Sequence, residues 1–590
     1  MVLPPGIRRG FAVAVAVAFV ALVLVPAAGA AQSPTAPVYD EAGRLVDTPF
    51  APSPAEPRLT SAEATSRFLA REKVAHWLDR YPPAPTTEAT FDAKTRRWRV
   101  NVWSGRAGQI ATGVVDDPNG QVLEAWTGPQ VAWKMARGGK GAFGGKTLNQ
   151  PLVWLGFCLV FLVGLGNWRR LLSLRNLDVL VLLSFSASLA FFNRGEIFRS
   201  VPLAYPPLLY LLARTAWIGF RGRAEAAPRA VWPVWVLAAA TVFLAGFRIG
   251  LNIQSPRGVI DVGYAGVIGA DRILDGEAPY GNMPVQAGRT PCGTADSEGE
   301  IRERIQTNGR CESSNERGDT YGPVSYVAYV PAVLAFGWSG KWDSLPAAHA
   351  AAIGFDLLVL GGLVLVGLRF GGSRLGATLT FAWCAYPFTA YTLNANSNDA
   401  LMPALLVLGF WLATSTWARG TFTALAAWTK FGALLVVPLW ITYPDGLRLR
   451  SALRFAAGFA VATAAGFSIL LLEPGLIDVV RTFWDRSVGF QLGRHSPFSL
   501  WDWGSYRAAG IPDLGGVQTL LQVALIAFAG VVAAVPLRKG PLQLAALTAA
   551  VLLGFELVLT HWFYLYLPWV LPFVLLALFL PRAETHAQAV

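Results

Sequence analysis

Long apolar segments recur along most of this chain, and they constrain its fold more than any other feature. Of its 590 residues, 54% are hydrophobic and only 15% are charged. A soluble domain cannot bury so much apolar surface, whereas a membrane-spanning helix needs about 20 consecutive, mostly apolar residues. The sequence therefore predicts a polytopic α-helical membrane protein.

About 13 transmembrane helices are predicted after residue 150, on the criterion of a long apolar run. These segments cover residues 151–167, 178–193, 201–219, 231–247, 323–338, 348–368, 375–392, 400–418, 421–441, 453–472, 516–535, 541–560 and 563–580.

Positive charge marks the loops that strict alternation assigns to the cytoplasm. Those rich in Arg or Lys are 167–176, 221–229, 444–454 and 536–540. The same alternation places two long polar loops, 248–322 and 473–515, outside. One basic loop, 369–374, also falls outside and breaks the rule, so a re-entrant segment between 338 and 420 is one way to restore it. The polar motif at 392–406 is expected to face the cytoplasm.

The N-terminal region precedes these helices. Residues 1–30 combine Arg8 and Arg9 with an apolar run and small residues, which predicts a signal peptide or an uncleaved signal anchor. Residues 31–135 then form an extracytoplasmic domain with a helix followed by alternating strands, an α+β arrangement that resembles PepSY-like domains. The Gly-rich stretch 136–150 is expected to be a flexible linker.

One stretch carries four acidic residues where a predicted span leaves the membrane. In "DVGYAGVIGADRILDGEAPYG" these are Asp261, Asp271, Asp275 and Glu277, and Asp261 stands closest to the membrane. A carboxylate at this boundary is well placed to take a proton from an acceptor hydroxyl while a lipid-linked donor lies in the bilayer beside it. The alternative is an ordinary acid at a helix start.

This stretch, together with "TYGPVSYVAYVP" (320–331), resembles the polyprenyl-phosphate-dependent mannosyltransferases of glycosyltransferase family 87, in the GT-C superfamily. The shared pattern is an acid just after a membrane helix, a Tyr three residues on, an Ala-rich helix, Gly-x-x-x-Tyr and a later Tyr-x-Pro. Its positions here are Asp261, Tyr264, Gly276, Tyr280, Tyr321 and Pro323. An insert between Gly281 and Tyr321 and additional N-terminal spans depart from the pattern.

The resemblance implies a GT-C-like catalytic domain over residues 231–580, with accessory helices over 151–230. It implies transfer of mannose, or another hexose or pentose, from a polyprenyl-phosphate donor to a glycan, glycolipid or protein. The family's catalytic base falls by position on Asp261. Three tyrosines of the pattern, Tyr264, Tyr280 and Tyr321, are expected to shape the substrate site.

A cation in mid-span, Lys430, and three cations in the second outer loop are candidates for binding the donor phosphate. Lys430 lies within the apolar segment 421–441, where a cation costs about 2.5–3.5 kcal/mol and usually has a function. Related transferases carry a Lys in a similar helix. In the second outer loop, Arg486, Arg494 and His495 lie among Trp and Phe residues.

Each of these assignments has an alternative. Lys430 could be a snorkelling or structurally paired lysine, and the second loop a plain aromatic belt with solvated charges. His561, at the outer end of its predicted helix, is grouped with the tyrosines that shape the substrate site, although an interfacial histidine with its partners satisfied is the commoner case. Cys292 and Cys311, 19 residues apart in the first outer loop, predict a disulfide, with two free thiols as the alternative.

The function expected is therefore that of a hexosyl or glycosyl transferase in the plasma membrane, with its active site on the extracytoplasmic side. A transporter or flippase of a lipid-linked or small anionic substrate is the alternative, but the sequence lacks the internal symmetry typical of transporters. So many spans exceed what a membrane-anchored binding protein needs. No cofactor, metal site, nucleotide-binding loop or nucleic-acid partner is indicated, and metal dependence stays open.

Overall fold

The computed structural model describes the chain from residue 57 onward with gaps, and before that only strands β1 (Val38–Tyr39) and β2 (Leu45–Val46), which pair antiparallel. The described ranges are 57–105, 109–127, 131, 144–193, 197–222, 232–256, 258–294, 301, 303–342, 344–494, 496–503 and 513–581. The predicted signal peptide and most of the predicted linker lie outside them.

The chain divides into two compact units, and each is described by itself. The first unit comprises Met1–Gly139, Ala190–Ser200 and Ser499–Gly515. The second comprises Lys140–Leu189, Val201–Phe498 and Gly516–Val590.

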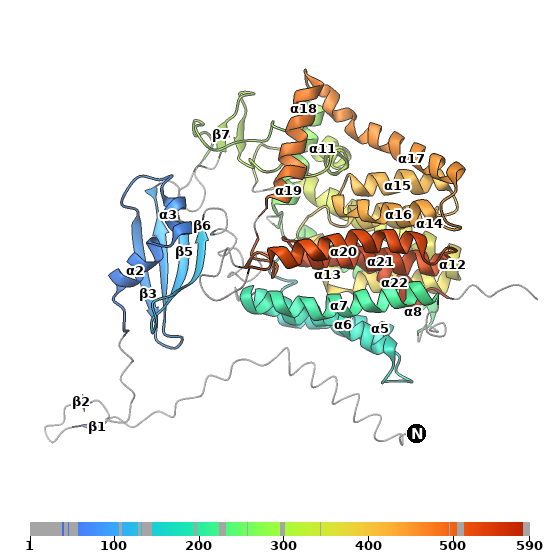
Figure 1. Ribbon diagram of the computed structural model, residues 1–590, viewed down its shortest axis with the longest axis horizontal. Helices are drawn as coiled ribbons and strands as arrows, with labels where there is room; N and C mark the ends of the chain where they lie inside the picture. Colours follow the sequence, from blue (N-terminus) through green and yellow to red (C-terminus); the bar gives the residue numbers. More distant parts are fainter. Residues whose placement is uncertain are drawn as a thin grey trace, which may run out of the picture. The chain divides into compact units, whose positions relative to one another are not determined.

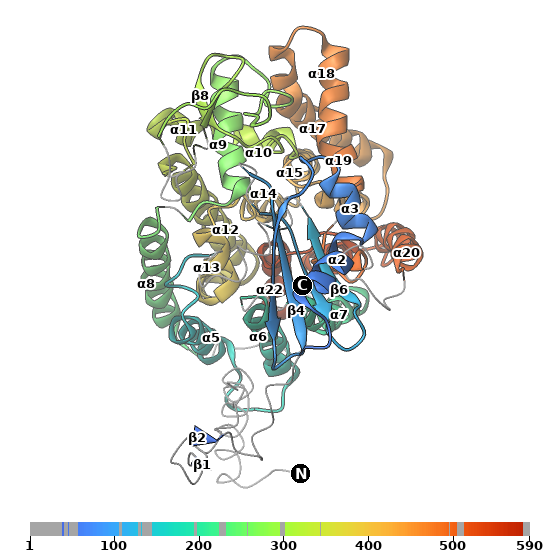
Figure 2. The same ribbon diagram turned by 90° about the vertical axis from the view of Figure 1, so that its left-hand side faces the viewer.

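A four-stranded antiparallel sheet and two helices form the core of the first unit (Figure 2). Along one strand Trp98, Val100 and Val102 are buried while Arg97 and Arg99 are exposed, the alternation expected when one face of a sheet meets a core. The predicted helix followed by a small sheet is therefore present. Its elements are α2 (Ser61–Leu69), α3 (Glu72–Leu78), β3 (Thr86–Asp92), β4 (Arg97–Trp103), β5 (Gln109–Asp116) and β6 (Val122–Thr127).

A buried carboxylate, Asp117, ties the start of this domain to its sheet. It accepts hydrogen bonds from the backbone N–H groups of Arg58 (3.0 Å) and Leu59 (2.9 Å) and from the side chains of Trp98 (3.1 Å) and Arg96 (2.8 Å). Burial opposes the charged form, but the hydrogen bonds outweigh it and lower the pKa of Asp117 to about 2. Asp117 therefore has a structural role, since it joins the residues before α2 to the sheet.

The second unit is built from apolar helices, and Figure 1 shows the longer ones lying roughly side by side. On α8, the side chains of Trp235, Val242 and Phe243 are each more than 70% exposed, as expected for a surface that meets lipid. Within the described residues, six helices are long and apolar enough to cross a membrane, which agrees with a membrane-embedded protein. They are α6 (Leu174–Phe192), α8 (Val234–Ile253), α12 (Pro346–Ala385), α17 (Leu449–Phe467) with η3 (Ser468–Leu472), α20 (Gly515–Ala534) and α21 (Pro541–Val558).

The remaining helices complete this unit; α7 is long, and the others are shorter. Those that pack among the long helices are α5 (Pro151–Leu165), α7 (Ile197–Arg221), α13 (Pro387–Asn394), α14 (Leu401–Trp411), α15 (Thr416–Ala427), η2 (Phe431–Val436), α16 (Val437–Thr442), η6 (Tyr564–Tyr566) and α22 (Leu567–Phe579). The polar connections contain α9 (Asp261–Leu274), β7 (Glu303–Ile305), β8 (Cys311–Ser313), α10 (Pro323–Val327), α11 (Val330–Phe336), α18 (Leu476–Phe483), η4 (Trp484–Gly489) and α19 (Phe490–Leu492).

Helix α12 is a hairpin of two antiparallel legs. Gly372 breaks the helical backbone with φ of 72°, a conformation that glycine adopts without strain. The legs then run so close together that a Cβ on Gly367 would lie 2.2 Å from the Cα of Gly376. The loop 369–374 is therefore the turn of this hairpin.

A second reversal occurs at Lys430, inside the segment predicted as one span over 421–441. Arg419, near the start of α15, donates hydrogen bonds to the carbonyls of Trp440 (3.1 Å) and Tyr443 (2.7 Å), at and just beyond the end of α16. Helix α15 and the η2–α16 segment are thus antiparallel. The single-span prediction is wrong, because two short apolar legs read as one long run in the sequence.

The segment predicted as a span over 323–338 is also divided, into the five-residue α10 and the seven-residue α11. At about 1.5 Å per residue, neither helix alone approaches the roughly 30 Å of a hydrocarbon core. Ser325 of α10 donates a hydrogen bond to the carbonyl of Thr429 (2.9 Å), so α10 lies beside the turn at Lys430.

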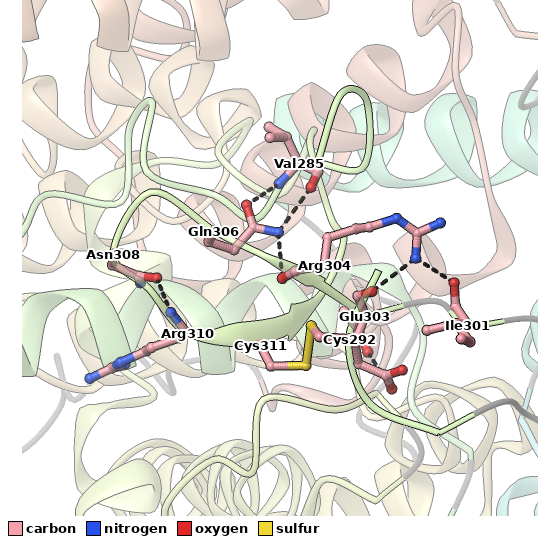
Figure 3. Close-up of a disulfide and its surroundings, with 10 residues drawn as sticks. Val285, Cys292, Ile301, Glu303, Arg304, Gln306, Asn308, Arg310 and Cys311 are labelled. Atoms are coloured by element: carbon pink, nitrogen blue, oxygen red, sulfur yellow. Dashed lines mark hydrogen bonds between the residues drawn. A yellow bond between two sulfur atoms is a disulfide. The ribbon is translucent and has the colours of Figure 1, made fainter. Parts of the chain in front are cut away.

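The long polar connection after α8 holds a disulfide-linked hairpin (Figure 3). Strands β7 and β8 pair antiparallel, and Cys292 is bonded to Cys311 with their Cα atoms 5.9 Å apart. The Gln306 side chain accepts from the backbone N–H of Val285 (3.0 Å) and donates to its carbonyl (2.9 Å). These two hydrogen bonds hold Val285, which precedes the hairpin in the sequence, beside strand β7. The predicted pairing of the two cysteines is present.

Candidate functional site

Helix α9 begins against the break between α13 and α14. The backbone N–H of Ile260 donates to the carbonyl of Ala395 (3.2 Å), and this contact fixes where the helix starts. Asp261 is the first helical residue and is exposed. Within the described part of the chain its carboxylate has no hydrogen-bond or ion-pair partner. As the first residue of α9, it lies at the positive end of the helix dipole, which favours a negative charge there.

The break between α13 and α14 is a buried loop held in place by α8 and α12. Asn396 adopts a left-handed backbone conformation with φ of 53°, which Asn tolerates better than most residues. Its side chain accepts a hydrogen bond from Asn252 (2.7 Å), which is itself bonded to His349 (2.8 Å). The expectation that the 392–406 motif faces away from Asp261 is wrong, since the hairpin of α12 returns this motif to the start of α9.

This loop positions a buried carboxylate, Asp399, opposite a lysine. Asp399 accepts from the ammonium of Lys430 (3.1 Å) and from the indole N–H of Trp569 (3.0 Å). The expectation of a cation in mid-span is wrong, because Lys430 stands at the turn between α15 and η2. The ammonium keeps N–H groups free for a ligand, because lysine has three N–H donors and Asp399 is its one acceptor among the described residues.

Aromatic rings enclose this ion pair. The Lys430 nitrogen lies 5.0 Å from the ring centre of Tyr321 and 5.6 Å from that of Trp569, both within cation–π range. Tyr566 stacks on Trp569 at 4.1 Å. Burial, and next the nearby charge of Asp261, raise the pKa of Tyr321 well above its ordinary value, so this phenol stays protonated.

A second cation approaches from the connection after α19. Arg494 lies 3.2 Å from Nε2 of His561, and Ser496 lies 2.8 Å from its Nδ1. A guanidinium can only donate, so Nε2 accepts and the imidazole proton sits on Nδ1, facing the Ser496 hydroxyl. Tyr566 lies within electrostatic range of Arg494, Asp399 and Asp261.

These side chains form what we call the Asp261 cluster, at one end of the helical unit. Its members are Asp261, Tyr321, Asp399, Lys430, Arg494, His561, Tyr566 and Trp569.

Other predicted site residues have structural partners or lie apart. Tyr264 is buried, donates its hydroxyl to the carbonyl of Ser313 (2.7 Å) and stacks on Trp342 at 4.4 Å, so it joins α9 to the disulfide-linked hairpin. Tyr280 donates to the backbone carbonyl of Tyr321 (2.9 Å) and thereby positions that tyrosine. Arg486 pairs with Asp319 rather than with any member of the cluster. His495 lies outside the described residues.

The far end of α9 carries a paired charge network. Arg310 lies 2.9 Å from Asp271 and 2.7 Å from Asp275, while buried Arg272 is paired with buried Glu312. Burial and the neighbouring Asp275 raise the pKa of Asp271, although both arginines oppose this shift. These acids hold α9 against the β7–β8 hairpin.

Three members of the cluster were not predicted as site residues: Asp399, Tyr566 and Trp569. Asp399 belonged to a polar motif expected on the opposite side, and the Asn residues around it are equally typical of a helix start. The aromatic pair lay at the head of an apolar segment, where Tyr and Trp also mark membrane interfaces. A carboxylate beside a lysine across two apolar helices is a contact that the sequence does not reveal.

Comparisons with known proteins add no assignment to this geometry. The chain matches no protein-family model, and a search of curated proteins finds no similar sequence.

Proposed function

We propose that this protein is an extracytoplasmic glycosyltransferase that moves a sugar from a polyprenyl-phosphate donor to a hydroxyl acceptor. One observation carries the proposal: the unpaired carboxylate of Asp261 stands in one cluster with the cations Lys430 and Arg494, at the end of an apolar helical unit. Transfer from a lipid phosphate needs a base, a cation for the departing phosphate and access from lipid.

The reaction follows from these groups. Asp261 takes the proton of the acceptor hydroxyl as its oxygen attacks the anomeric carbon of the donor sugar. The bond from that carbon to the phosphate oxygen breaks, and the polyprenyl phosphate leaves with the bonding electrons. Lys430 and Arg494 offset the negative charge that grows on the departing phosphate. The protonated Tyr321 supplies a further hydrogen-bond donor beside Asp261.

The pairing of Lys430 with Asp399 supports this role for the lysine. A lone ammonium would hold a phosphate too tightly for release or would be too costly to keep without ligand. Held by Asp399, the ammonium is oriented before the donor arrives and retains N–H groups for it. The aromatic rings of Tyr321 and Trp569 limit water around the pair.

The proposed topology places the Asp261 cluster outside the cytoplasm of a plasma-membrane protein. Arg369, at the turn of α12, donates to the carbonyl of Trp411 (2.6 Å) and to the hydroxyl of Thr414 (2.9 Å). This turn and the loop before α15 therefore lie at the same end of the helices. That end also holds Tyr443 and the basic loop after it. Assigned to the cytoplasm, the turn now obeys the positive-inside rule. With both hairpins counted as two passes each, and with α10 and α11 not crossing, the proposed topology has about 13 passes, more than the six helices that meet the length criterion among the described residues.

A transfer assay with two kinds of donor tests this function. The purified chain in lipid nanodiscs would be given a labelled hexose on polyprenyl phosphate, or on a nucleotide diphosphate, with a cell-envelope glycolipid extract as acceptor. The expected result is label joined to the acceptor from the polyprenyl donor only. Movement of the intact lipid-linked sugar across vesicles without transfer would favour a flippase, and use of the nucleotide donor would contradict the proposed donor class.

A further inference from the structure

A cavity of 370 Å³ lies beside the Asp261 cluster, between the segment before α10 and the helical turns after α18. Its volume falls in the range of roughly 300–1,000 Å³ that is usual for small-ligand sites. The residues that matter for its chemistry are Arg317, Asp319, Thr320, Asp485, Arg486 and Phe490.

Asp319 gives this cavity an unsatisfied acceptor. The residue is 1% exposed, and its Oδ2 accepts from the backbone N–H of Gly281 (2.9 Å) and faces Arg486 (3.5 Å). Its Oδ1 is buried and has no hydrogen-bond partner among the described residues. Leaving a buried carboxylate oxygen unpaired is unfavourable, and such exceptions in a folded protein call for a reason. A ligand hydroxyl in the cavity would satisfy it.

The charges around the cavity favour a neutral ligand. Two arginines, Arg317 and Arg486, are balanced by two carboxylates, Asp319 and Asp485. A phosphate would meet both carboxylates, and a cation would meet both guanidinium groups. A molecule with many hydroxyl groups can donate to the carboxylates and accept from the arginines at once, and Phe490 supplies an apolar surface for its carbon atoms.

Two short connections join the cavity to the Asp261 cluster. Asp319 is two residues before Tyr321, whose ring faces Lys430. The Phe490 ring lies 5.5 Å from the guanidinium of Arg317, in the cavity, and 5.8 Å from that of Arg494, in the cluster. A ligand held in the cavity therefore lies close to the groups proposed to carry out the transfer.

We propose that this cavity is a saccharide-binding subsite, which holds a neutral sugar ring of the acceptor through Asp319, Arg317 and Asp485. Its acceptor role rests on the proposed function, whereas binding of a neutral saccharide stands independently of it.

Ligand-observed NMR on the purified full chain in nanodiscs tests the binding, with methyl α-D-mannopyranoside as the neutral probe and inorganic phosphate as the charged one. The glycoside is expected to bind, and Arg317→Ala and Asp485→Asn, both at exposed positions, should each weaken binding about tenfold through loss of a charge-assisted hydrogen bond. Asp478→Asn, on α18 outside the cavity, is the matched control and should bind as the wild type does. Failure of the wild type to bind the glycoside, binding of phosphate in its place, or unchanged affinity in both cavity variants would overturn the proposal.

A transfer assay on the same samples separates this proposal from the proposed function. Asp261→Asn should retain glycoside binding while losing transfer, and Arg317→Ala should raise the KM for the acceptor about tenfold with the donor KM unchanged. If the wild type binds the glycoside in the cavity but transfers no sugar, the enzyme function fails and the subsite stands. If it transfers sugar and Arg317→Ala leaves the acceptor KM unchanged, the subsite fails and the function stands.

Discussion

The two ends of α9 carry the same kind of side chain in opposite circumstances. At its C-terminal end, Asp271 and Asp275 share Arg310, and the adjacent Arg272 is paired with buried Glu312. At its N-terminal end, Asp261 has no partner among the described residues. The first group fastens the helix to the disulfide-linked hairpin. The second leaves a carboxylate exposed at the start of the helix.

This contrast separates acids that stabilise the fold from an acid available for chemistry. The oxygens of Asp271 and Asp275 are already occupied by Arg310, so these carboxylates are not free to bond an acceptor hydroxyl. The carboxylate of Asp261, at the start of α9, has no such partner among the described residues. Substitutions at the two ends should therefore differ in kind: loss of rate at one end and loss of local stability at the other.

The largest effect is expected from Asp261→Asn. This change keeps the shape of the side chain and removes its ability to take a proton, so the turnover rate should fall by about 10²–10⁴-fold. Single-turnover transfer of a labelled sugar from the polyprenyl-phosphate donor measures it. Hydrogen exchange over α9 should match that of the wild type. Faster exchange over α9, or loss of the helix, would show that Asp261 is structural instead.

Arg272→Met should act on stability. It leaves Glu312 buried without its partner, which typically costs about 3–5 kcal/mol. Hydrogen-exchange protection of the β7–β8 hairpin is the readout, and it should collapse. The double variant Arg272→Met with Glu312→Leu removes both charges and should recover much of the protection. Equal loss in both variants would mean that the pairing is not what holds the hairpin.

Loss of the disulfide in Cys292→Ser with Cys311→Ser should loosen the same hairpin. A closed loop of about this size contributes roughly 3 kcal/mol by limiting the unfolded chain. Faster hydrogen exchange is expected between residues 285 and 313, with less than a tenfold change in transfer rate. A rate loss as large as that of Asp261→Asn would place the hairpin in the reaction itself.

Lys430→Met should raise the donor KM by about 10- to 100-fold, the usual loss when a charged hydrogen-bond donor is removed. The change also leaves buried Asp399 without its ion-pair partner. The double variant Lys430→Met with Asp399→Asn therefore serves as the control for folding. The double variant should regain thermal stability and keep the high KM. Recovery of a normal KM would assign Lys430 a purely structural role.

The smallest effect is expected from Asp275→Asn. Its side chain is 36% exposed and its pairing with Arg310 lies near the surface, where such pairs contribute about 0–1 kcal/mol. Turnover should stay near the wild-type value and thermal stability should change by a few degrees at most. A tenfold loss of turnover would erase the distinction between the two ends of α9.

The sequence predicted the helical membrane class, the small sheet and the disulfide, because each depends on local pattern: apolar runs, strand alternation and a cysteine pair. It failed where the chain reverses inside an apolar run. Lys430 marks such a reversal, and it does not interrupt hydropathy enough to be separated from a continuous span. The turn at Gly372 was predicted as the loop 369–374, but the divided segment 323–338 was counted as a span. Counting that span reverses the assigned side of every later segment, and missing the reversal at Lys430 reverses it again, so the two errors cancel after residue 441.

For the site, the sequence identified residues but not their partners. Asp261 and Lys430 stood out because charge at a membrane boundary or in an apolar run is costly. Asp399 did not, because its importance lies in an ion pair with a residue 31 positions away, across a reversal that was not predicted. Tyr264 was assigned to the substrate site, whereas its contacts are with the hairpin.

Chemical rescue tests the central claim most directly, namely that the free carboxylate of Asp261 is the base of a glycosyl transfer. Transfer of labelled sugar from the polyprenyl-phosphate donor would be measured for Asp261→Gly and Asp271→Gly, with and without added formate, a carboxylate small enough for the vacated space. Formate should raise the rate of Asp261→Gly and leave Asp271→Gly unchanged. A folded Asp261→Gly protein that turns over normally without formate, or formate rescue confined to Asp271→Gly, would contradict the assignment.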